Sequence, residues 1–69
     1  MLKRSLTIAG HRTSIALEPE FWQALEALAA ERGVALAALV RQIDEARAQP
    51  NLSSALRVAV LEWYRGRLG

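Results

Sequence analysis

The segment RTSIAL, residues 12–17, constrains the fold most, because polar and apolar residues alternate in it as in a half-buried strand. One side of this strand would carry Thr13, Ile15 and Leu17. The opposite side would carry Arg12, Ser14 and Ala16. A single strand is not stable alone in water, so this segment needs a second strand.

An alternating segment, RSLTIA, also precedes it at residues 4–9, with Leu6 and Ile8 on one side and Ser5 and Thr7 on the other. Gly10-His11 between the two segments can form a two-residue hairpin loop with glycine first. Equally, residues 1–11 can form a loose arm. The sequence therefore leaves open whether residues 1–11 are an arm or an extra strand.

The rest of the chain predicts three helices, over residues 19–32, 35–48 and 53–66. Pro19 suits the first position of a helix, and Gly33 is a typical residue to end one. The segment Gln49-Pro50-Asn51 is predicted to break the second helix, because the residue before a proline avoids helical geometry. The pattern is thus a short strand region followed by helices.

The size of the chain favours a dimer. Sixty-nine residues make one domain, residues 1–69, which buries only about 60% of its unfolded surface. Yet 52% of the residues are hydrophobic, and no cysteine is present to form disulfides. The helix over 53–66 is apolar on more than one side, so a second chain would complete the core. Two copies of residues 12–17 would then pair antiparallel about a two-fold axis.

Charge is unevenly placed: residues 1–17 contain three cationic side chains and no acid, whereas residues 18–48 hold six acids against three arginines. A cationic N-terminal region is typical of a surface that meets a polyanion, with a solubilising basic tail as the alternative. The sequence has no nucleophile–base pair, no glycine-rich phosphate loop and only one histidine. We therefore expect no catalysis, no metal and no cofactor.

The order of these segments resembles the ribbon-helix-helix DNA-binding family, the fold of MetJ-type and Arc-type repressors. The resemblance rests on RTSIAL, LEPEFW and ERGVALAALVRQI; KRSLTIAGHRTSIALEPEFW and NLSSALR are similar to a small bacterial subfamily. It spans about residues 3–65. It implies a mostly α fold with a short β ribbon, built as an intertwined homodimer with an intermolecular antiparallel two-stranded sheet and an added C-terminal helix.

In that family the ribbon enters the DNA major groove, and its outward side chains contact base edges. The resemblance assigns this role to Arg12, Ser14 and Ala16. Lys3 and Arg4 are expected to contact phosphates from an arm or an outer strand. Backbone N–H groups at Ala35 and Leu36, where the second helix starts, are expected to hold a further phosphate.

The dimer core is expected to use apolar residues of the ribbon and of the last two helices: Ile15, Leu17, Leu39, Ile43, Leu56, Val60 and Trp63. Which helix is the family's second one stays open. We favour residues 35–48, with 53–66 as an added helix. However, NLSSALRVAVLEWY also resembles the family's second helix, which would make residues 35–48 an insertion.

The leading interpretation is a cytoplasmic, sequence-specific DNA-binding protein, a transcriptional regulator that acts on double-stranded DNA as a homodimer. One alternative is an antitoxin of the same fold with a toxin partner. Another is a helical protein-interaction module that does not bind DNA, which the acidic first helix and the non-polar Ala16 favour. No apolar run approaches the ~20 residues of a membrane helix, so no membrane partner is expected.

Overall fold

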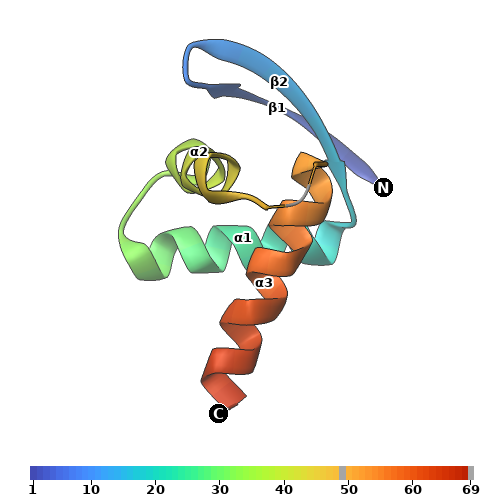
Figure 1. Ribbon diagram of the computed structural model, residues 1–69. Coiled ribbons are helices and arrows are strands. Elements are labelled where there is room, and N and C mark those ends of the chain that lie inside the picture. Colours follow the sequence, from blue (N-terminus) through green and yellow to red (C-terminus); the bar gives the residue numbers. More distant parts are fainter. Residues whose placement is uncertain (49, 69) are drawn as a thin grey trace.

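The computed structural model describes residues 1–48 and 50–68 and contains a two-stranded sheet followed by three helices. Strand β1 covers Leu2–Ile8 and strand β2 covers His11–Leu17, and the two are antiparallel. Helices α1, α2 and α3 cover Pro19–Arg32, Leu36–Ala46 and Leu52–Leu68. All three helices lie on one side of the sheet (Figure 1). The predicted fold, mostly α with a short β ribbon and an added C-terminal helix, is confirmed.

Both strands of the sheet belong to the same chain, and a two-residue turn joins them. The turn consists of Ala9 and Gly10, so the predicted loop Gly10-His11 is wrong by one residue. Ala9 has φ 52° and Gly10 has φ 84°. Positive φ at both central positions is the geometry of a type I′ turn, whose twist matches that of the paired strands. The turn places Ile8 opposite His11 and makes the segment before it a strand instead of an arm.

Local signals account for both ends of α1 and for the start of α3. Pro19 is the first residue of α1, and Gly33 ends the helix in the left-handed conformation, with φ 70°. At the start of α3, the Asn51 side-chain oxygen accepts a hydrogen bond from the backbone N–H of Ser54 at 3.1 Å, as an N-cap does. The predicted break at Gln49-Pro50-Asn51 includes Gln49, which lies outside the described residues.

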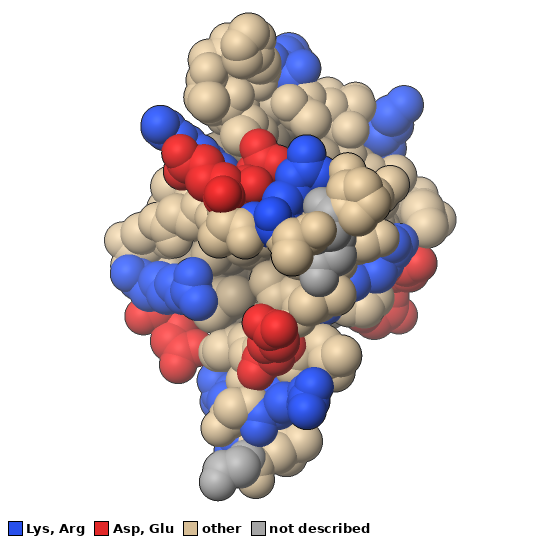
Figure 2. Space-filling view, in the orientation of Figure 1, with Lys and Arg blue, Asp and Glu red and all other residues tan. Residues whose placement is uncertain are grey.

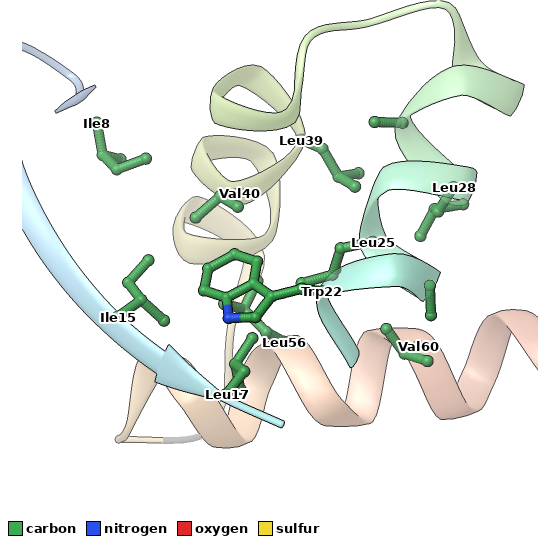
Figure 3. Packing of buried hydrophobic residues seen from close by; sticks show 12 residues of the cluster. Ile8, Ile15, Leu17, Trp22, Leu25, Leu28, Leu39, Val40, Leu56 and Val60 are labelled. Atoms are coloured by element: carbon green, nitrogen blue, oxygen red, sulfur yellow. The ribbon is translucent and has the colours of Figure 1, made fainter. Parts of the chain in front are cut away.

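The hydrophobic core is built around Trp22 of α1. Figure 3 shows its ring between Ile8 and Ile15 on the strand side and Leu25 and Val40 on the helix side. The side chain is only 2% exposed, and its indole Nε1 donates a hydrogen bond to the Leu2 carbonyl oxygen at 2.8 Å. Because a buried indole N–H needs an acceptor, this bond ties the start of β1 to α1.

Arg4 and Arg57 join distant parts of the chain. Arg4 of β1 donates to Glu26 of α1 at 2.6 Å, and its guanidinium lies 5.1 Å from the centre of the Trp22 ring. Arg57 of α3 donates through Nε and Nη2 to one oxygen of Glu18, at 3.0 and 2.9 Å. The first contact holds the sheet on α1, and the second holds α3 at the point where β2 passes into α1.

We predict that Trp22→Phe lowers the free energy of unfolding by about 2 kcal/mol, because it removes the hydrogen bond to Leu2 and leaves unfilled volume in the core. Urea denaturation measures the change. Trp63→Phe is the control: this half-exposed indole donates to Glu31 at 2.6 Å in an exposed position, so its loss should cost less than about 1 kcal/mol. Equal losses for both variants would contradict the central role of Trp22.

We predict an acid-sensitive contribution from Glu18. A backbone hydrogen bond at Glu18 itself and the bonds from Arg57 hold the pKa of this carboxyl below its ordinary value of 4.5. A lowered folded-state pKa stabilises the fold above about pH 4.5, and the stabilisation is lost as pH falls through the lowered value. Denaturation should therefore find Glu18→Gln less stable than the parent at pH 7, with the difference shrinking at pH 3.

The matched control for that experiment is Glu20→Gln, which removes one exposed carboxylate from the first turn of the same helix. Both glutamates lie near the helix N-terminus, where negative charge is favoured, so the two variants lose a similar interaction with the helix dipole. If the two variants lose the same stability at pH 7, the bonds between Glu18 and Arg57 contribute nothing measurable.

Candidate nucleic-acid interface

The face of the sheet that points away from the helices forms the candidate interface. Directly opposed residues of an antiparallel pair lie on the same face. The register pairs Lys3 with Ala16, Ser5 with Ser14 and Thr7 with Arg12, so these six residues share that face. We call this set the outer face. The intervening pairs, which include Arg4 with Ile15 and Leu6 with Thr13, point toward the helices.

Burial along the strands follows this division. Lys3, Ser5, Thr7, Arg12 and Ser14 are exposed, and Ala16 is half-buried. Across the middle of the outer face, the hydroxyl oxygens of Ser5 and Ser14 lie 3.4 Å apart. The base-contact residues expected from the resemblance, Arg12, Ser14 and Ala16, therefore lie side by side on one accessible surface.

Ser5 and Thr7 are members of this surface that the sequence assignment of site residues omitted. The alternation in residues 4–9 had placed both on one side of their strand. What the alternation lacked was the pairing, because a strand does not reveal from its own sequence which strand lies beside it. The structure supplies the pairing through a turn of two positive-φ residues, Ala9 and Gly10, and Gly10 is the part of this turn that the sequence indicates.

The outer face is cationic. Residues 1–17 contain no Asp or Glu, and Lys3 and Arg12 both project from this face. At the sheet end, at the top of Figure 2, the charged atoms are those of Lys and Arg within a mainly uncharged surface, whereas both signs of charge lie over the helices. A surface of one sign raises the local concentration of a ligand of the opposite sign.

Arg4, one of the two expected phosphate contacts, is placed differently from Lys3. It lies opposite Ile15 on the inner side of the sheet, its side chain is 37% exposed, and it is bound to Glu26 and stacked on Trp22. An arginine held in this way anchors β1 to α1. The structure therefore separates two adjacent cations, one outward and one structural.

The edge of β2 that faces away from β1 is open. The pair Ile8–His11 closes a two-residue turn and is hydrogen-bonded, so every second pair from it is hydrogen-bonded as well. The backbone N–H and C=O groups of Arg12, Ser14 and Ala16 then point away from β1. The Ala16 carbonyl accepts a long bond from Ser53 Oγ at 3.5 Å. Within residues 1–48 and 50–68, no third strand pairs with this edge.

The start of α2, expected to hold a phosphate, has an exposed Ala35 in extended conformation and no side-chain cap. Leu36 is half-buried and packs against the core. Only backbone N–H groups are available at this end of the helix. Any anion held there would be bound without help from a side-chain hydroxyl.

Most of the residues expected in a dimer core are buried within a single chain. Five of them are at most 4% exposed: Ile15, Leu17, Leu39, Leu56 and Val60. Ile43 and Trp63 are half-buried against the same cluster. The chain achieves this because β1 covers one side of the core and α3 another. Exposed apolar side chains remain on α3, where Leu61 and Tyr64 line an open groove with Phe21 of α1.

Two classes of site find no support in the described residues. The described residues contain no group of three or more His, Asp or Glu side chains placed to hold a metal ion. None of the helices among them has the length and apolar character needed to cross a membrane. The outer face is thus the surface with the clearest chemical character.

Comparison with known proteins agrees with this geometry. A family model described as a ribbon-helix-helix domain matches residues 1–64, which include both strands, α1, α2 and most of α3. Neither a curated protein nor a solved structure matched the chain. The match covers nearly the whole chain, and the protein therefore belongs to the ribbon-helix-helix family, a non-enzymatic fold family that binds DNA.

Proposed function

We propose that this protein is a transcriptional regulator that binds double-stranded DNA as a homodimer and reads sequence through the outer face. One observation carries the proposal: the sheet presents a helix-free, acid-free face on which Arg12 and Ser14 are exposed side by side. Membership of a DNA-binding family supports it. A chain without cysteine is compatible with the reducing cytoplasm, where such a regulator would act.

The dimer forms through the open edge of β2. Exposed strand edges invite pairing, and a second copy supplies an identical edge. With Ser14 on the two-fold axis, Ser14 pairs with Ser14 of the partner subunit and Arg12 pairs with Ala16 of the partner subunit. This register uses all three residues whose backbone groups point outward. Helix α2 packs against β1, and α3 packs against β2, where Ser53 Oγ donates to the Ala16 carbonyl oxygen.

Arg12 is the base-reading residue of the proposed complex. A guanidinium can donate two hydrogen bonds to the O6 and N7 acceptors of guanine in the major groove. Ser14 can donate to or accept from several bases and discriminates weakly. Ala16 lies between Lys3 of its own chain and Arg12 of the partner subunit, so its small side chain leaves room for two long cations. It also suits contact with a thymine methyl group.

The backbone N–H groups at Ala35 and Leu36 are proposed to bind a phosphate beside the groove, where the positive end of the helix dipole favours an anion. Because no side chain caps this end of α2, the contact would use only the backbone N–H groups of Ala35 and Leu36. Any specificity would then come from the sheet, and α2 would contribute affinity and orientation.

The groove between α1 and α3 supports an alternative function, that of an antitoxin. Its apolar lining, which includes Phe21, Val58, Leu61 and Tyr64, is the surface that a toxin partner would use if the protein were an antitoxin. The same surface would serve an interaction module that does not bind DNA. A DNA-binding assay at low salt separates the interaction module from the regulator and the antitoxin, since only the module would show no affinity for DNA.

We predict that Ser14→Pro converts the dimer to a monomer while the helices remain folded. Proline removes the Ser14 N–H, which points to the open edge and makes no bond to β1, so the loss falls on the contact between subunits. Sedimentation equilibrium measures the association, and circular dichroism checks the helices. Ser14→Ala keeps the backbone donor and should stay dimeric. A Ser14→Pro protein as dimeric as the parent would rule out pairing through this edge.

We predict that Arg12→Ala weakens binding to the selected DNA site by about tenfold or more, because a bidentate arginine–guanine contact contributes roughly 1–3 kcal/mol of discrimination. The site is first obtained by selection from random DNA with the purified protein. Binding to random DNA should change much less. Arg65→Ala, on an exposed residue toward the far end of α3 from the sheet, controls for the loss of charge. Equal losses on selected and random DNA would make Arg12 a phosphate contact.

A further inference from the structure

We infer that β1 is a second DNA-contacting strand, and that Lys3, Ser5 and Thr7 contact the sugar-phosphate walls of the groove on either side of the bases. This inference rests on the proposed function. It concerns residues that a ribbon made of β2 alone would not bring to DNA. The recognition surface of the dimer is then a four-stranded sheet in the order β1, β2, β2 and β1, and no longer a two-stranded ribbon.

The first argument is the register of the hairpin. Each outward residue of β2 has an outward neighbour on β1: Thr7 beside Arg12, Ser5 beside Ser14, and Lys3 beside Ala16. These pairs lie on one face and the sheet carries all three helices on the other (Figure 1). Any approach that brings Arg12 to DNA therefore brings the side chains of β1 to the same molecule.

The second argument is width. Neighbouring strands lie about 4.8 Å apart, so the outer strands of a four-stranded sheet are separated by about 14 Å. The major groove is about 12 Å wide. With the strands running along the groove, the two β2 strands fit between its walls and the two β1 strands fall over the walls. Lys3, Ser5 and Thr7 are thereby directed at phosphates and away from base edges.

The third argument is chemistry. Lysine and hydroxyl side chains are common phosphate ligands, and β1 presents only these two kinds on the outer face. The arginine of β1, Arg4, could donate two hydrogen bonds to a phosphate, but it points inward and is held by Glu26 and Trp22. Those contacts fasten β1 to the helices, so Lys3 is delivered from a rigid strand. A flexible tail would pay more ordering entropy for the same contact.

The test compares the salt dependence of DNA binding for the parent, Lys3→Ala and Arg65→Ala on the same selected site. A dimer without Lys3 loses two phosphate contacts, so the slope of log K against log salt should become shallower by about 1.8. The affinity for selected and random DNA should fall by the same factor. Arg65→Ala should keep the parent slope.

A second measurement keeps the hydroxyl contacts testable. Thr7→Val preserves shape and removes the hydroxyl, so it should weaken binding on both kinds of DNA without changing the slope, and Thr7→Ser should restore the affinity. In an ethylation-interference assay, modification of two phosphates in the groove walls should weaken binding of the parent. The same modifications should no longer weaken binding of Lys3→Ala. Circular dichroism checks the fold of each variant, and Lys3→Gln serves if Lys3→Ala is unstable.

The outcomes separate this inference from the proposed function. The role of β1 is overturned if Lys3→Ala keeps the salt slope of the parent while Arg12→Ala loses affinity for the selected site as expected. The DNA-binding proposal would then still stand. A loss confined to one DNA sequence would make Lys3 a base contact and would also overturn the assignment to the walls. A parent protein without DNA affinity at low salt overturns both.

Discussion

The buried indole of Trp22 is the contact on which the arrangement of sheet and helices depends. Its ring occupies the space between the strands and the helices (Figure 3), and its N–H bonds to the carbonyl of Leu2 at the start of β1. Burying the polar atom of such a side chain without an acceptor would cost about 1–3 kcal/mol, so the bond to Leu2 offsets this cost. Trp22 therefore fills the core and, together with the pairing to β2 and the Arg4–Glu26 contact, holds β1 over the helices.

Anchoring β1 has a direct consequence for the surface. The sheet of one chain is already two strands wide, with Arg4 securing its inner side and Lys3 on its outer side. The edge of β2 away from β1 remains the place where another strand can be added. In the proposed dimer, the family ribbon is a pair of β2 strands, and β1 of each subunit flanks it on either side. That flank is the feature that distinguishes this chain from a minimal ribbon.

Much of the fold was predictable because local patterns determine it. The alternation in residues 4–9 and 12–17 predicted which side chains share a face, and the structure places Arg12 and Ser14 outward and Ile15 and Leu17 inward. Prediction was less successful for the turn and for the burial of the core. The loop lies at Ala9-Gly10, where Ala9 adopts a positive φ. Alanine rarely adopts this conformation, so the sequence does not predict it.

The sequence by itself determined the faces of the strands, the presence of three helices and the membership of a ribbon-helix-helix family, since periodicity and residue order carry that information. Only the tertiary structure decided that β1 pairs with β2, that Arg4 is turned inward, and that a single chain buries Leu39 and Leu56. The physical reason is that these depend on contacts between residues far apart in the chain. A local pattern says which side of a strand is apolar, but it does not say what covers it.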